Sequence, residues 1–90
     1  MISLHATIRA VVLDESVCWR ISVGYLDTDC RVREFATGYS GSLPGAQAVI
    51  QARTTDRYDT DDVKFYWSPL DMQNVCTGRA LVTVKQEQEV

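Results

Sequence analysis

One stretch decides the fold, and it reads Gly41-Ser42-Leu43-Pro44-Gly45-Ala46-Gln47-Ala48-Val49-Ile50-Gln51-Ala52-Arg53. Ser42 is a good N-cap, because its hydroxyl accepts a hydrogen bond from a free amide of the first helical turn. Pro44 suits that turn, where a missing N–H costs nothing. Apolar residues then recur at helical spacing and share one stripe: Leu43, Ala46, Val49 and Ile50. The stretch predicts a helix that covers one face of a sheet, in which Gly45 marks either a close backbone approach or a tolerant first turn.

Two strands at the start of the chain are predicted to form a hairpin. Apolar residues take the even positions of residues 2–12, and residues 17–25 alternate in the same way after a turn at 14–16. Same-face residues must pair across a hairpin, so a four-residue loop would set Val12 beside Trp19.

Residues 30–36 are predicted to form a third strand. Its alternation slips, and a bulge near Arg33 and Glu34 would return Phe35 to the core. Residues 38–41 then read as a flexible lead into the helix.

The chain after the helix predicts two further strands. Residues 54–62 are polar and read as an exposed loop, and residues 63–67 alternate as a strand. Ser68-Pro69-Leu70-Asp71 has the cap and proline of a short helix start, which Gly78 would close. Residues 80–85 form the last strand and residues 86–90 a frayed polar tail.

These elements predict an α+β fold: an antiparallel β-sheet of about five strands with one main helix on one face, in the order βββαβ(α)β. Ninety residues make a single domain, 1–90, with one modest core. No segment approaches the roughly 20 apolar residues of a membrane span, so we expect a soluble, cytoplasmic protein that does not insert into a membrane. The three cysteines, Cys18, Cys30 and Cys76, form no C-x-x-C pair and are expected to be reduced, buried thiols.

Positive and negative residues occupy different parts of the predicted fold, which the net charge of −3 does not reveal. Carboxylates gather in turns and in the tail, whereas cations lie on the predicted strands. The result is a basic sheet face inside an acidic rim, whose candidate binding residues are Arg9, Arg20, Arg31, Arg33, Lys64 and Tyr66, with Lys85 on the last strand. Guanidinium groups pair well with phosphates and a tyrosine can stack on a base, so this face suits an RNA backbone or a carboxylate-rich protein groove. The alternative is an ordinary solvated face.

A second candidate surface is the acidic loop around Asp59, Asp61 and Asp62. It lacks the turn glycine and the distal glutamate of a calcium loop, so no metal site is predicted. It either presents phosphate-like charge to a basic protein surface or is a solvated turn.

Catalytic motifs are absent from the sequence. It contains no Walker-type glycine loop, no G-x-S-x-G elbow and one histidine, His5, which reads as an outward strand residue. No cysteine has a base beside it in the pattern. We therefore expect a non-enzymatic protein without cofactors.

At residues 39–48 the chain resembles small phage anti-CRISPR proteins, which inhibit type I RNA-guided complexes. The resemblance is carried by the strand pair with its acidic turn, the G-S-x-P-G-A-x-A helix start and the overall size with its own Met1 start. It implies a phage-encoded inhibitor, acting in the cytoplasm of a bacterial host cell, that docks on the Cas proteins or guide RNA of a type I surveillance complex (Cascade). Such an inhibitor blocks recognition of target DNA by occlusion. The family is diverse in sequence, so no functional residue is carried over.

A second resemblance competes with the first. Residues 38–41 before a helix, together with a final strand at 77–84, are similar to small ligand-sensing regulatory domains of biosynthetic enzymes. The alternatives are therefore a nucleic-acid-binding module that uses the basic face, or a ligand-sensing or oligomerisation module, as a monomer or a dimer. The outward apolar residues Val11, Leu26 and Leu81 permit a dimer.

Overall fold

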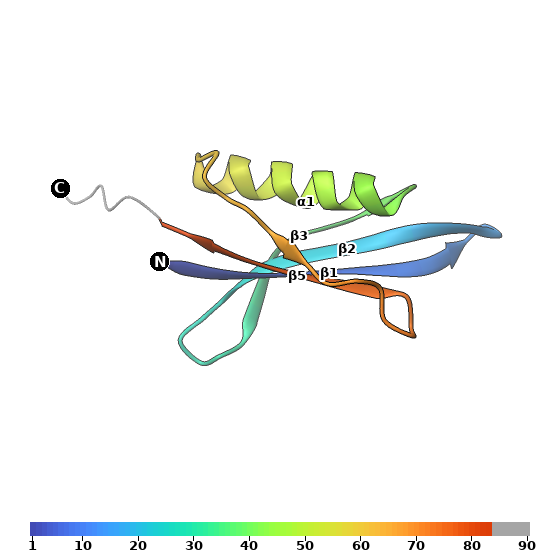
Figure 1. The fold of residues 1–90 in the computed structure, drawn as a ribbon, viewed down its shortest axis with the longest axis horizontal. Coiled ribbons are helices and arrows are strands. Elements are labelled where there is room, and N and C mark those ends of the chain that lie inside the picture. Colours follow the sequence, from blue (N-terminus) through green and yellow to red (C-terminus); the bar gives the residue numbers. More distant parts are fainter. Residues whose placement is uncertain (84–90) are drawn as a thin grey trace.

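The computed structural model describes residues 1–83. Its elements are, in chain order, β1 (Ile2–Leu13), β2 (Ser16–Leu26), β3 (Val32–Ser40), α1 (Leu43–Tyr58), β4 (Tyr66–Trp67) and β5 (Val75–Val82). Within this part of the chain the strands form one five-stranded antiparallel sheet in the order β3-β2-β1-β5-β4, and α1 lies along one face of it (Figure 1). The predicted α+β fold is confirmed.

The core lies between α1 and the sheet face that it covers. On α1 the side chains of Ala46, Ile50 and Thr54 are fully buried, and Leu43 and Val49 are partly buried. The sheet contributes every second residue of its long strands, as the period-two pattern predicts. Its buried members are Leu4, Ala6 and Ile8 on β1, Ile21 and Val23 on β2, Ala36 on β3, and Cys76, Ala80 and Val82 on β5.

Helix α1 begins as predicted but ends one turn later. The Ser42 hydroxyl accepts a hydrogen bond from the Gly45 amide at 3.0 Å. The helix continues to Tyr58, where the prediction ended it at Arg53. Thr54 and Tyr58 extend the inward stripe from Ile50 at i+4 spacing, so the polar run still has one side that packs.

The β1–β2 hairpin is tighter than predicted. Its loop is the pair Asp14 and Glu15, both with positive φ (49° and 66°), and Val12 faces Val17 instead of Trp19. The predicted four-residue loop was wrong, but its register differs by two residues, so every side chain keeps its predicted face.

The bulge in β3 is confirmed one residue further on. Val23 pairs with Ala36 and Gly24 pairs with Glu34, so Phe35 is the extra residue on β3. The strand runs to Ser40, which means that residues 38–40 are strand and not the predicted flexible lead.

The last third of the chain differs most from prediction. Regular pairing in β4 covers only two residues, and no helix follows Ser68, whose amide instead donates to the Thr77 carbonyl at 2.8 Å. The Asp71 carboxylate accepts from the amides of Gln73 and Val75 and closes a turn before β5. Gly78 lies inside β5, where a Cβ would collide with the Trp67 ring. The predicted strand residues Val84 and Lys85 and the tail 86–90 lie outside the described residues.

The helix of residues 43–58 is neither long nor apolar enough to cross a membrane, and residues 1–83 hold no other candidate span.

Candidate functional site

The sheet face opposite α1, which we call the open face, has three central rows of residues. Strand register sets these rows, because residues paired across antiparallel strands point to the same side. The first row holds Tyr66, Arg79, His5, Gly24 and Glu34, the second holds Thr77, Thr7, Ser22 and Thr37, and the third holds Val75, Arg9, Arg20 and Tyr39.

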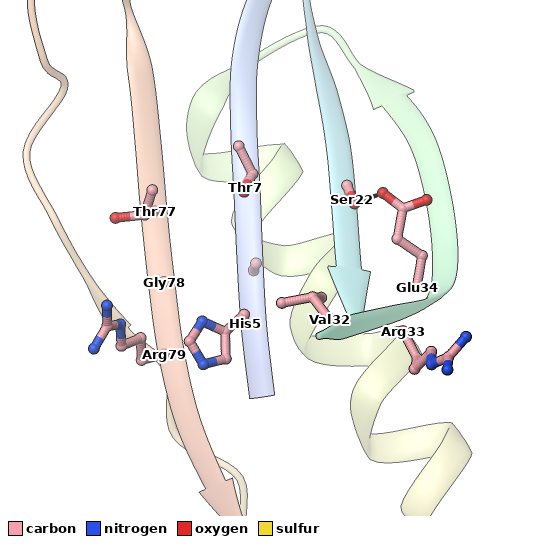
Figure 2. Close-up of a pocket in the computed structure, with 10 residues that line it drawn as sticks. His5, Thr7, Ser22, Val32, Arg33, Glu34, Thr77, Gly78 and Arg79 are labelled. Carbon is pink, nitrogen blue, oxygen red and sulfur yellow. Dashed lines mark hydrogen bonds between the residues drawn. The ribbon is translucent and has the colours of Figure 1, made fainter. Parts of the chain in front are cut away.

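A cleft of about 710 Å³ lies on this face. Figure 2 shows the side chains that line it, with α1 behind the strands: His5 and Thr7 come from β1, Ser22 from β2, Val32, Arg33 and Glu34 from β3, and Thr77 and Arg79 from β5. In Figure 1 the β2–β3 turn projects away from α1, to the side of the open face. This hairpin end and β5 are the two walls of the cleft.

Gly24 lets the β3 wall close in. A Cβ at this position would meet backbone atoms of Arg33 and Glu34, which cannot rotate away as a flexible side chain would. The bulge at Phe35 and the missing side chain at Gly24 together bring Val32 and Glu34 over the open face.

The turn that carries this wall is held by Asp27. Its carboxylate accepts from the backbone amides of Asp29 (2.8 Å) and Arg31 (3.0 Å), and it pairs with Arg33 Nε at 2.5 Å. The Arg31 amide and the Arg33 guanidinium hold the pKa of the Asp27 carboxyl below its ordinary value. Asp27 therefore stays ionised and braces the wall at neutral pH.

Hydrogen bonding inside the cleft links Ser22 to Glu34 and not to His5. The Ser22 hydroxyl donates its one proton to the Glu34 carboxylate, so that proton is not directed at the His5 imidazole (Figure 2). Among residues 1–83 no group of three or more histidine, cysteine or carboxylate side chains is placed to hold a metal ion.

A second hollow of about 460 Å³ adjoins the first at the β4 edge. Lys64 Nζ lies 5.6 Å from the centroid of the Tyr66 ring, and Arg79 lines both hollows. Ser3, Asp62, Ala80 and Leu81 complete the lining. A positive edge with an exposed aromatic ring is thus continuous with the cleft.

No protein-family model, curated protein or solved structure matches this chain.

The predicted basic residues divide into two groups. Arg9 and Arg20 are paired neighbours on the open face, and Lys64 and Tyr66 lie together at its β4 edge. Arg31 instead lies in the turn before β3, and Arg33 is opposite the core-side residue Tyr25 with its guanidinium bound to Asp27. Arg31 and Arg33 therefore shape the wall of the cleft more than they charge its floor.

The predicted acidic loop is also divided. Asp59 is the C-cap of α1, in the left-handed region with φ of 51°. Asp61 is exposed, and Asp62 lines the second hollow beside Lys64. The three carboxylates thus rim the end of α1, and Asp62 alone of these three reaches the open-face site.

Sequence reasoning missed Arg79, which lies centrally in the first row. The reason is Gly78, which was read as the end of a turn, so that the last strand was placed too late. Thr77, Arg79 and Leu81 alternate with buried residues, and that period-two signal would have found Arg79 if glycine had been accepted inside a strand.

The three free cysteines are less buried than predicted. Cys76 is buried, but Cys18 is half-buried and Cys30 is exposed in the β2–β3 turn. The expectation of buried thiols holds for Cys76 and is wrong for Cys30.

Proposed function

We propose that this chain is a non-catalytic binding module whose open face takes single-stranded nucleic acid. The observation that carries the proposal is the pattern of the first and third rows: Arg9, Arg20 and Arg79 lie on one sheet face, between exposed tyrosines at its two edges. The cations can bind phosphate oxygens, and the tyrosine rings can stack on the flat faces of unpaired bases.

The cations of this face are free to bind phosphate. Within residues 1–83, Arg9, Arg20 and Arg79 make no ion pair with a carboxylate, whereas Arg33 is paired with Asp27. All three are exposed. Because an arginine that is already paired gains less from a phosphate, unpaired arginines on one face are the groups that a nucleic-acid backbone can use.

Two tyrosines flank these arginines. Tyr66 is 69% exposed and Tyr39 is 56% exposed, at opposite edges of the sheet. Stacking of a base on an aromatic ring contributes about 1–3 kcal/mol and tolerates any sequence. A strand that crosses the sheet from β4 to β3 would therefore meet a ring at each end and arginines between them.

The acidic rim explains why a chain with a net charge of −3 suits this role. The carboxylates of Asp59 and Asp61 at the helix end repel a nucleic-acid backbone, while the arginines of the open face attract it. Charge arranged in this way orients a ligand instead of collecting it at random.

The test is a titration of a fluorescently labelled single-stranded RNA with the whole chain, read by anisotropy. Tyr66→Ala should weaken binding about 5- to 150-fold, the equivalent of one lost stacking contact. Tyr66→Phe is the matched control, because it keeps the ring and should bind like the wild type. Equal affinities for Tyr66→Ala and Tyr66→Phe would reject stacking at this edge.

A narrower proposal follows from the resemblance to phage anti-CRISPR proteins. In it, the ligand strand is the guide RNA of a type I surveillance complex, the acidic rim of Asp59, Asp61 and Asp62 faces basic surfaces of the Cas proteins, and target DNA is excluded by occlusion. The open face supports this version by offering a surface for the guide backbone.

Co-elution with a purified type I surveillance complex tests the narrower version. An occluding inhibitor should bind the assembled complex far better than free RNA and should abolish binding of target DNA. Binding to free RNA without co-elution would reject the inhibitor and leave the nucleic-acid module standing.

A further inference from the structure

The tip of the β1–β2 hairpin, residues 11–18, extends beyond the rest of the sheet, and we call it the arm. β5 pairs with β1 only as far as Arg9, and β3 pairs with β2 only from Trp19 onward. In Figure 1 the arm projects past the start of α1. Its two strands therefore pair only with each other, and both of its outer edges are free.

The arm is apolar where a solvated ribbon should be polar. Val12 and Val17 face each other across the ribbon and are 69% and 62% exposed, and Leu13 is 45% exposed. Val12 and Val17 lie on the core side of the sheet, next to the partly buried Trp19. Helix α1 does not extend over them, so they stay exposed. A two-stranded ribbon is marginally stable in water by itself, and an open edge beside apolar side chains invites pairing.

We propose that the arm binds the arm of a second copy of this chain, in a two-fold symmetric, antiparallel arrangement. A two-fold axis near Val12 and Val17 packs the same apolar pair of each copy against its equivalent, as an isologous interface requires. The open-face cleft lies beyond the arm and stays accessible in such a dimer.

Charge at the two ends of the arm favours this orientation. The tip carries Asp14 and Glu15, and the start of α1, whose first turn contains no acidic residue, lies near the base of the arm. An antiparallel crossing carries each acidic tip toward the partner's helix N-terminus, where negative charge is favoured. A parallel crossing would set the acidic tips against each other.

The backbone conformation of the turn residues also supports the dimer. Both Asp14 and Glu15 have positive φ, a conformation for which Asn-Gly is the favoured pair. Glutamate at φ of 66° costs local stability. In the dimer this cost is offset by the attraction between the tip charges and the partner's helix.

Sedimentation equilibrium of the full chain from micromolar to millimolar concentration tests the proposal. We expect a reversible shift from the 10.1 kDa monomer toward twice that mass. Val12→Thr combined with Val17→Thr keeps β-branched residues in the strands but removes the apolar contact, and it should raise the dissociation constant roughly a hundredfold. Met72→Thr is the matched control: Met72 is a fully exposed apolar residue in the turn before β5, outside the arm and both hollows, and its change should leave association unaltered.

A second variant separates dimerisation from folding. Asp14→Asn combined with Glu15→Gly installs the favoured turn pair, so it should raise the melting temperature of the dilute monomer while weakening the dimer several-fold. A chain that stays monomeric at millimolar concentration, or a dimer that the double threonine variant leaves intact, would overturn the proposal.

Discussion

Replacing Gly24 with alanine tests the feature that shapes the cleft, the closure of β3 over the open face. The three heavy atoms nearest to an added Cβ all belong to the backbone of Arg33 and Glu34, so no side chain can rotate to make room. In Gly24→Ala, either β3 moves away from β2 at this point or the pairing between β2 and β3 is strained.

The size of the effect follows from this contact. Overpacking in a closed site costs about 1–3 kcal/mol, and the lower entropy of the unfolded alanine chain returns about 0.4–1 kcal/mol. A net loss of roughly 1–2 kcal/mol should lower the melting temperature of a 90-residue domain by about 5–15 °C. Thermal unfolding followed by circular dichroism measures it.

Gly38→Ala is the matched control, because Gly38 lies on the same strand pair. There an added Cβ would be 3.8 Å from side-chain atoms of Ile21, which is ordinary contact, and no glycine in residues 1–83 has positive φ. This variant should melt at the wild-type temperature or slightly above it. If Gly24→Ala has the same melting temperature as Gly38→Ala, the β3 backbone does not cover Gly24 and the cleft lacks this wall.

Three further predictions concern stability. Thr54→Val should raise the free energy of unfolding by about 1 kcal/mol in urea denaturation, because the Thr54 hydroxyl is fully buried without a hydrogen-bond partner; an unchanged midpoint would argue against this. Arg57→Ala should cost about 0.5–1 kcal/mol, since the guanidinium carbon of Arg57 lies 4.5 Å from the centroid of the Phe35 ring, whereas Arg53→Ala on the exposed side of α1 should cost nothing measurable. The carboxyl of Asp27 should titrate below the ordinary aspartate pKa in a carbon-detected NMR titration; its contribution to stability is then complete above that ordinary value and is lost as the pH falls through the lowered pKa, and an ordinary pKa would contradict the brace.

The fold was predictable where the two faces of an element differ in polarity. The alternation of residues 2–12 and the Ser42 cap with its apolar stripe gave the first strand and the start of α1. Prediction was wrong where one residue type has two uses. Gly78 was read as a chain breaker, although it is the strand position on which the Trp67 ring packs. Ser68 was read as a helix cap, although its amide joins β5.

The candidate site was predictable only in part. Arg9, Arg20, Lys64 and Tyr66 were placed on one face by strand parity, which is a local property. The slip in the alternation of residues 30–36 predicted the bulge, but the closure of the β2–β3 wall also depends on the fit of Gly24 against the β3 backbone, a contact between strands that no local pattern contains. The pairing of Arg33 with Asp27 likewise depends on how the turn folds back.

The most direct test of the central claim is the salt dependence of single-stranded RNA binding. If Arg9, Arg20, Lys64 and Arg79 each neutralise a phosphate, the logarithm of the affinity should fall against the logarithm of salt with a slope of roughly −3. Arg9→Gln combined with Arg20→Gln should reduce the slope to about half of that value, and Arg53→Gln on α1 should leave it unchanged. A slope near zero, or equal slopes for the double variant and the wild type, would contradict binding through the open face.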